Sequence, residues 1–421
     1  MKFAIGKLFP VVLIFLLLLQ SATATDGYLS AGYGTRQLGK AGAGIAASGD
    51  ALAQATNPAA LIGARDRIDL GLTLFRPVRF GAISGNTLPP GYPDVNGSYD
   101  ANRVVNFVIP EFGISRELNG RVVYGIALYG NGGMNTSYKT PIPLLGTTRG
   151  GVDLEQVFLA PAVALKLDKR NTVGVSANLL YQRFAAEGLE NFANPAYSID
   201  PAHVTNTGHS NSYGFGVRIG WQAELDKFIS VGATYQSRTY ATAFDRYKGL
   251  FAEGGKFDVP ANFGAGVLLH LTPRVNVEAD EERILYSSVK SIANSDANQA
   301  QLGAANGPGF GWHSINALKA GVEVEAARGV TVRAGYNHSG LPFDKTQTFF
   351  NLLAPAVVQD HLHAGATFKR ANGNEISVAY VHAFNNTLNG DNSIAPAYGG
   401  GNANLSMYQN SFSVAYAWAK R

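Results

Sequence analysis

The sequence of 421 residues contains no cysteine, and only 15% of its residues are charged. The lack of cysteine excludes a disulfide framework and thiolate metal sites. Beyond residue 24 there is no run of about 20 apolar residues, which excludes a transmembrane helix. The net charge of +4 is small and dispersed, so the composition does not indicate nucleic-acid binding.

Glycine and aromatic residues are abundant instead. The chain has 49 glycines, and 11% of its residues are aromatic and 46% hydrophobic. This balance is unusual for a large soluble domain. It is typical of a membrane β-barrel, where aromatic side chains form girdles at the membrane interfaces and small residues leave room in the lumen.

The first 24 residues have the pattern of a secretory signal peptide. A short basic start precedes an apolar run over residues 8–19, and Ala22-Thr23-Ala24 provides a small-x-small cleavage site. The apolar run is too short to span a membrane. We therefore expect cleavage of residues 1–24 and export, either as a secreted soluble protein or into the outer membrane of a Gram-negative bacterium.

Apolar residues then recur at every second position in fourteen segments, which predicts fourteen β-strands. The clearest segment is 213–222, where Tyr213, Phe215 and Val217 alternate with small or polar residues. The predicted strands are residues 68–80, 104–116, 121–131, 154–167, 172–182, 213–222, 228–238, 261–271, 274–286, 316–324, 330–337, 361–368, 375–384 and 407–418.

The links between these segments alternate in length. The links after even-numbered strands are short and rich in turn formers, such as residues 117–120, whereas those after odd-numbered strands are long, such as 183–211. This alternation predicts an all-β fold, a 14-stranded antiparallel transmembrane outer-membrane β-barrel over residues 65–421. A soluble β-sandwich is the alternative, and it would bury the alternating apolar face in a core.

Residues 25–64 lie between the signal peptide and the first strand. They are rich in glycine and alanine, lack a strand or helix period, and end in Asn57-Pro58-Ala59. This arrangement resembles the plug (hatch) of the FadL/TodX-type outer-membrane transporters. The resemblance implies an N-terminal plug inside the barrel and passive import of hydrophobic small molecules. It implies long-chain fatty acids as the default cargo and aromatic hydrocarbons or related esters as the alternative.

Four basic residues have the parity of the barrel interior and are candidate ligand-binding residues: Arg218, Arg238, Lys319 and Arg333. They either form a charge ladder that ties the wall to the plug, or hold the anionic head group of a cargo through charge-assisted hydrogen bonds. The resemblance implies such a head-group site without assigning it to one residue. Arg183 follows the fifth strand with the parity of the lipid face, so it is a candidate for binding cargo or, instead, for contacting a loop or lipopolysaccharide.

Gly130-Asn131-Gly132-Gly133 ends the third predicted strand. Glycine at this density favours a bulge or kink, and an ordinary loop start is the alternative. The resemblance implies that this strand kinks inward and opens a lateral gap in the wall. We expect cargo to collect on apolar loop residues such as Leu145 and Leu353, and to leave through the gap into lipid.

The sequence predicts no catalytic residue, cofactor or metal site. His361 and His363 share a strand face, but no third metal ligand accompanies them. An outer-membrane esterase and an open porin are the remaining alternatives. The expected partners are the hydrophobic ligand, outer-membrane lipid and lipopolysaccharide, and the barrel-assembly machinery, and we expect a monomer with no nucleic-acid partner.

Overall fold

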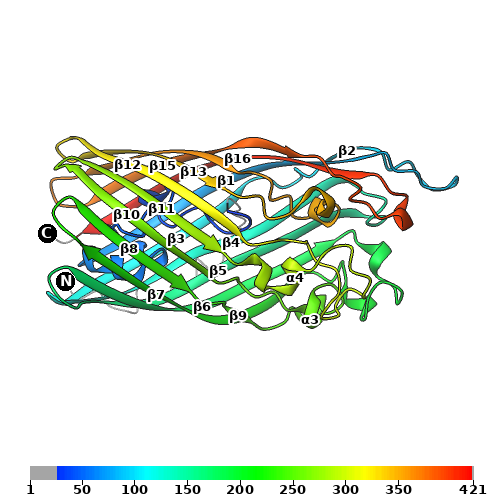
Figure 1. Cartoon of the computed structure of the whole chain (residues 1–421), viewed down its shortest axis with the longest axis horizontal. Coiled ribbons are helices and arrows are strands. Elements are labelled where there is room, and N and C mark those ends of the chain that lie inside the picture. Colours follow the sequence, from blue (N-terminus) through cyan, green and yellow to red (C-terminus); the bar gives the residue numbers. More distant parts are fainter. Residues whose placement is uncertain (1–25, 420–421) are drawn as a thin grey trace.

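The computed structural model describes residues 26–419 and has the form of a long barrel (Figure 1). Fourteen antiparallel strands form the wall, and β16 pairs with β1 to close it. The predicted fold class is therefore confirmed. The predicted signal peptide lies outside the described residues.

The wall strands are β1 (Arg67–Ser84), β3 (Phe107–Asn119), β4 (Val122–Pro141), β5 (Arg149–Lys166), β6 (Asn171–Glu187), β7 (Ser210–Glu224), β8 (Ile229–Gln236), β10 (Asn262–Thr272), β11 (Val275–Ile284), β12 (Ile315–Ala327), β13 (Val330–Ser339), β14 (Asp360–Lys369), β15 (Glu375–Leu388) and β16 (Asn402–Ala419). Two short strands lie off this path: β2 (Gly97–Asp100) pairs with β1, and β9 (Tyr240–Ala241) pairs with β7. Among the described residues, no helix has the length and apolar character needed to span a bilayer.

The alternating apolar residues point outward. In β7, Tyr213 is 60% exposed and Phe215 is 54% exposed, whereas Ser212 and Arg218, on the other face, are buried. A soluble sandwich would show the reverse, with the apolar face in its core. The sandwich alternative is therefore wrong, and the exposed apolar band fits a lipid environment.

Short turns gather at one end of the barrel and long loops at the other (Figure 1). The loops contain the short helices α3 (Ala252–Gly255) and α4 (Lys290–Ala293) and pack through aromatic rings. Phe184, for example, contacts Tyr247 and Phe251 at centroid distances of 4.8 and 4.7 Å. The loop end is thus a folded cap with its own apolar core.

The N-terminal segment, residues 26–64, lies inside the barrel, and we refer to it as the plug. Its short elements are α2 (Thr35–Leu38), η2 (Ala53–Ala55) and η3 (Pro58–Gly63), and most of its residues are buried. Wall glycines allow it to pack directly on the strands. A Cβ on Gly174 of β6 would lie 2.3 Å from the carbonyl carbon of Pro58, so only glycine fits there.

Candidate functional site

Asn57 fixes the plug to the wall. Its side chain caps η3 by accepting a hydrogen bond from the amide of Ala59 at 3.0 Å. Its Nδ2 donates to the carbonyl of Ile45 within the plug at 2.7 Å and to that of Trp221 in β7 at 3.1 Å. The segment Asn57-Pro58-Ala59 is therefore a rigid contact between plug and wall.

Strands β3 and β4 separate toward the loop end. They pair from Asn119–Val122 up to Phe112–Leu128 and no further. Beyond this point the two strands are not paired with each other. We call this unpaired stretch, residues 107–111 of β3 and 129–137 of β4, the seam. Near Ser137 a short parallel bridge to Asn102 closes its outer end.

At the seam, β4 pairs with the plug instead of β3. On its other side, the register of β4 against β5 shifts between Gly130 and Gly132, as in a β-bulge. The amide of Ser30 donates to the carbonyl of Asn131 at 3.1 Å, and the amide of Gly133 donates to that of Tyr28 at 3.0 Å. The first described residues of the plug thus cover the seam from inside.

The four residues Gly130 to Gly133 all lie within β4, which continues to Pro141. The alternative that they begin a loop is therefore wrong. A Cβ on Gly132 would lie 2.2 Å from the carbonyl oxygen of Tyr28, whereas one on Gly130 would meet only Ile109 of β3. Position 132 therefore needs glycine for contact with the plug, whereas position 130 faces the seam.

Four small cavities follow one another from the loops to the lumen. The first, of about 40 Å³ among the loops, is lined by Leu145 and Leu353, and the second, of about 20 Å³, begins at the adjoining Ala354. Phe75 lines both the second and the third, of about 30 Å³, and Tyr33 lines both the third and the fourth, of about 20 Å³. Neighbouring cavities in this series share or adjoin lining residues such as Phe75 and Tyr33, so they lie in a row with these side chains between them, and we call this row the apolar path.

Each cavity is too small for a hydrophobic cargo as it stands. One water needs about 10–15 Å³ of such volume, so each has room for roughly one to four waters. The plug lines the second, third and fourth cavities through residues between Gly27 and Ile45 and, in the fourth, also through Thr56. Passage along this path therefore requires movement of the plug.

The expectation that Leu145 and Leu353 present an apolar surface to the outside is wrong. Leu145 is fully buried and Leu353 is 6% exposed. Both side chains belong to the apolar core of the loop cap, which forms because the long loops pack on each other through apolar side chains. They line the first cavity from within.

Most of the predicted basic residues have carboxylate partners. Lys319 lies 3.2 Å from Asp26 of the plug and 3.0 Å from Glu282, and Arg333 lies 2.6 Å from Glu323. The pair of Lys319 with Asp26 joins wall to plug, as a charge ladder between them would, whereas the pair of Arg333 with Glu323 joins two wall strands. Arg183 pairs with Glu155 of the neighbouring strand at 2.7 Å.

Arg238 departs from the predicted position in the lumen wall. Strand β8 ends at Gln236, and Arg238 lies beyond it among the loops, where it pairs with Asp258 at 2.6 Å. Its parity matched the interior, but parity carries no information once the strand has ended. This placement removes Arg238 from the interior candidates.

Arg218 is the predicted interior residue without a carboxylate partner. It is 2% exposed and donates to the carbonyl of Thr56 in the plug at 2.8 Å and to Oε1 of Gln236 at 2.7 Å. Its Nε has no hydrogen-bond partner, and no ion pair joins it to any of residues 26–419. It lines the fourth cavity with Tyr33, Glu282 and Lys319. Arg218 is therefore a buried cation with one unpaired donor, the type of group that binds anions through charge-assisted hydrogen bonds.

Sequence reasoning missed Arg79, which lies at the outer end of the seam and lines the second cavity. Its parity along β1 is that of Asp69, which points inward. This parity was the signal in the sequence that could have identified Arg79 as an interior residue.

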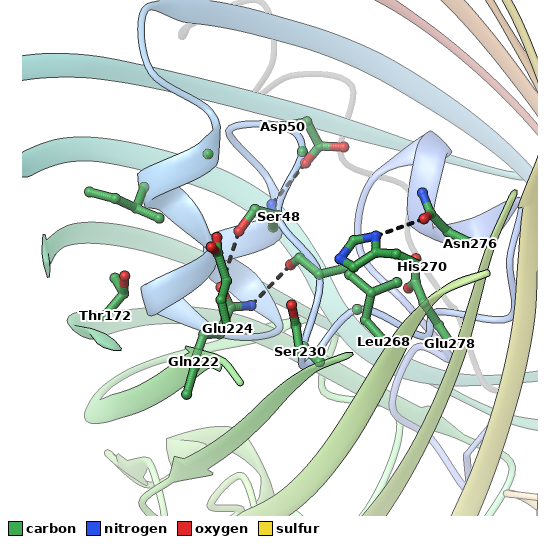
Figure 2. A pocket seen from close by; sticks show the side chains of 18 of the residues that line it. Ser48, Asp50, Thr172, Gln222, Glu224, Ser230, Leu268, His270, Asn276 and Glu278 are labelled. Carbon is green, nitrogen blue, oxygen red and sulfur yellow. Dashed lines mark hydrogen bonds between the residues drawn. The ribbon is translucent and has the colours of Figure 1, made fainter. Parts of the chain in front are cut away.

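A larger cavity of about 440 Å³ opens at the turn end of the barrel (Figure 2). Its lining is polar, with Ser48 donating to Gln222 at 3.1 Å and His270 lying 2.8 Å from Asn276. The plug separates it from the apolar path, since Ile45 lines the fourth cavity and Ala46 the large one. We call this cavity the vestibule. Its polar lining does not favour the binding of an apolar molecule.

The loop cap contains one carboxyl group with a shifted pKa that bears on its stability. Asp296, between β11 and β12, donates its backbone amide to Gln347, between β13 and β14, at 2.9 Å. Burial raises the pKa of the Asp296 carboxyl to about 7, although a hydrogen bond from the amide of Phe350 acts against this shift. Its carboxyl group therefore titrates near neutral pH.

The folded-state pKa of Asp296 lies above the value of about 4 in an unfolded chain, so the folded loops bind this proton more tightly. The contact between the two loops should lose stability as the pH rises from about 4 to about 7. Hydrogen exchange at the amides of residues 345–352, corrected for intrinsic rates, should accelerate over this range. Asp296→Asn should abolish the acceleration. Corrected exchange that does not change with pH in the native protein would contradict the assignment.

The comparisons with known proteins agree with this geometry. The sequence pattern of the family described as "Outer membrane protein transport protein (OMPP1/FadL/TodX)" matches residues 16–417. No curated protein sequence gives a significant match.

Several solved structures share the fold. A Pseudomonas aeruginosa FadL homologue superposes with a TM-score of 0.71 at 16% identity, over 93% of this chain and 99% of that one. The Pseudomonas putida toluene transporter TodX gives 0.68, and the Ralstonia pickettii toluene transporter TbuX gives 0.65, with the same identity and coverage. At this identity the likeness concerns the fold alone.

The family match covers nearly the whole chain, and the fourteen-stranded barrel with an internal N-terminal segment is the fold of its solved relatives. The chain therefore belongs to the OMPP1/FadL/TodX family of outer-membrane transport proteins for hydrophobic compounds, which is a family of channels and not of enzymes.

Proposed function

We propose that the protein takes up long-chain fatty acids passively and releases them sideways through the seam into the membrane. Cargo enters among the loops, follows the four cavities, and leaves between β3 and β4 when the first residues of the plug move. The seam supports this route because β4 there is hydrogen-bonded to the plug and has no pairing with β3.

The polar vestibule at the turn end supports lateral release. A cargo leaving that way would pass a charged and polar lining and then water, at a cost of about 0.8 kcal/mol for each methylene that is hydrated again. Release through the seam keeps the hydrocarbon in apolar surroundings, since Phe75, Phe107 and Ile109 form an apolar cluster there.

The observation that carries the choice of cargo is Arg218. Its guanidinium is buried between plug and wall and has no carboxylate partner among the described residues. Its Nε is buried without a hydrogen-bond partner, and the residue lines the fourth cavity. A carboxylate head group would supply both the missing charge and the missing acceptor. The fatty acid would then bind with its head in the lumen and its tail along the apolar path.

A neutral aromatic hydrocarbon is the second candidate. TodX and TbuX are described as toluene transporters. Tyr28 and Trp312 line the second cavity, and Tyr33 and Tyr129 line the third, so aromatic surfaces face the path. For such a cargo Arg218 would serve only to bind plug to wall through Thr56.

Arg218→Gln distinguishes these cargoes. We expect uptake of labelled palmitate at low concentration to fall about tenfold or more, because a charge-assisted hydrogen bond contributes roughly 1.5–3 kcal/mol. Uptake of labelled toluene should be unchanged. Both are measured in proteoliposomes that contain the purified protein.

The matched control is Arg328→Gln, which removes an exposed arginine from the turn between β12 and β13 and should change neither uptake. If Arg218→Gln leaves palmitate uptake unchanged, the fatty-acid assignment is wrong. If the native protein transports toluene and not palmitate, the second candidate replaces the first.

A further inference from the structure

Arg79 occupies a break in the wall pairing of β1. The pairing of β1 with β3 ends at Phe75, and its pairing with β2 begins at Phe80. Between these two positions β1 has no strand on the side of the seam. Arg79 lies in this interval and is 1% exposed.

The guanidinium of Arg79 spans the outer end of the seam. Its Nη1 donates to the carbonyl of Asn135 in β4 at 2.5 Å and to the side-chain oxygen of the same residue at 3.1 Å. Its Nη2 donates to the carbonyls of Ala101 at 3.2 Å and Val104 at 2.5 Å, in the link before β3. Four acceptors from both edges therefore hold the group in one position.

These acceptors are all neutral, and the guanidinium carbon otherwise lies over the ring of Phe107, whose centroid is 5.9 Å away, so no carboxylate within residues 26–419 compensates the charge of Arg79 by contact. Among the described residues four arginines are buried: Arg67 and Arg333 have carboxylate partners, whereas Arg79 and Arg218 have none. The Nε of Arg79 also lacks a hydrogen-bond partner. This charged donor is fully buried, so an acceptor reaches it only when the packing around it opens, as it would on movement of the plug.

The surroundings of this donor are apolar. Arg79 lines the second cavity with Met134, Met407 and Trp312, and Tyr28 of the plug forms another side. Gly133, which pairs with Tyr28, lies on the same cavity. Movement of this part of the plug would therefore enlarge the cavity at the point where Arg79 faces it.

We propose that Arg79 is a second anion-binding residue, which contacts the carboxylate of a fatty acid as the cargo passes through the seam. This inference rests on the proposed uptake of such cargo. Arg79 lies closer to the loop end of β1 than Phe75, which packs on the apolar seam residues Phe107 and Ile109. A fatty acid held there keeps its head near the outer rim while its tail extends through the seam into lipid.

Arg79→Gln and Arg79→Lys test this assignment with a matched pair of probes, palmitic acid and its methyl ester. In proteoliposomes, Arg79→Gln should slow transfer of the acid about tenfold, the effect of losing one charge-assisted hydrogen bond, and leave transfer of the ester unchanged. Arg79→Lys keeps the charge and should give an intermediate rate for the acid. An equal loss for acid and ester would show that Arg79 only holds the rim, and unchanged rates would show no role; either result overturns the assignment.

The native protein separates this inference from the proposed function. If it transfers neither probe, the proposed function fails. If it transfers both and Arg79→Gln does not discriminate between them, only the role of Arg79 fails.

Assembly of the variants is checked by the resistance of the unheated barrel to dodecyl sulfate. If they do not assemble, crystals of the native protein soaked with an α-bromo fatty acid provide the second measurement. An anomalous bromine peak beside Arg79 supports the assignment, and a peak beside Arg218 alone overturns it.

Discussion

Replacing Gly130 with leucine should reduce the uptake of hydrophobic cargo at least about tenfold, which corresponds to a barrier about 1.4 kcal/mol higher. A Cβ at this position points across the seam to Cγ2 of Ile109 at 2.9 Å and meets nothing else within 4 Å. The longer side chain would fill the space through which we expect cargo to leave. Uptake of labelled palmitate and of labelled toluene should both fall, because the obstruction does not depend on charge.

The matched control for this variant is Gly120→Leu, in the turn between β3 and β4, where an added Cβ meets nothing within 4 Å. Its uptake should equal that of the native protein. Normal uptake by an assembled Gly130→Leu barrel would exclude the seam as the exit. Gly132 is a poorer choice for this experiment, because a side chain there collides with the carbonyl of Tyr28 and displaces the plug instead of blocking the seam.

The strands could be predicted because their signals are local. Period-two alternation marks a face, and turn formers mark the short links, so all fourteen wall strands were found. Their outer ends were placed less well. Residues 132–141 of β4 and 149–153 of β5 were expected to be loop, yet residues 132–137 and Pro141 of β4 pair with residues 149 and 151–156 of β5. Their many glycines and polar residues hide the alternation.

The seam depends on contacts between distant parts of the chain. The glycines at 130, 132 and 133 indicated an irregular strand, but the partner of that strand is Tyr28 and its neighbours, about a hundred residues earlier. No local pattern encodes such a pairing. The aromatic contacts of the loop cap, such as those of Phe184, escaped prediction for the same reason.

Charge pairing was equally hard to predict. Parity placed Arg218, Lys319 and Arg333 on the inner face, where all three are buried. Which of them has a carboxylate partner depends on neighbouring strands and on the plug, as the pairs of Lys319 with Asp26 and Glu282 show. The distinction between a structural cation and a candidate ligand contact therefore emerged only from the folded chain.

The plug is also held at the turn end by a buried charge cluster around Glu375. Oε2 of Glu375 in β15 lies 3.2 Å from Arg36 of the plug and 3.1 Å from Arg67 of β1. Both arginines also donate to the carbonyl of Gly49 in the plug, and Arg67 pairs with Asp69 at 2.7 Å. The carboxylate of Glu375 thus compensates the charges of Arg36 and Arg67, which both hold the carbonyl of Gly49.

Glu375→Gln should therefore loosen the plug. It removes the carboxylate partner of Arg36 and one of the two partners of Arg67 without changing the size of the side chain. Breaking a buried ion pair destabilises the state that contains it by about 3–5 kcal/mol, and a shift of about 3 kcal/mol would raise the population of displaced plugs roughly a hundredfold. In planar bilayers the variant should show open-channel events that the native protein rarely shows.

Lys369→Gln is the control for Glu375→Gln, because Lys369 lies 3.9 Å from Glu375 with a side chain that is 58% exposed and contributes little to the cluster. Its conductance should match that of the native protein. If Glu375→Gln also remains closed, the cluster does not retain the plug, and the contacts of Asn57 with Ile45 and Trp221 become the principal restraint. If the Glu375→Gln channel opens while palmitate uptake keeps its native rate, displacement of the plug at the turn end is independent of its movement at the seam. In that case only the plug residues near Tyr28 control release of the cargo.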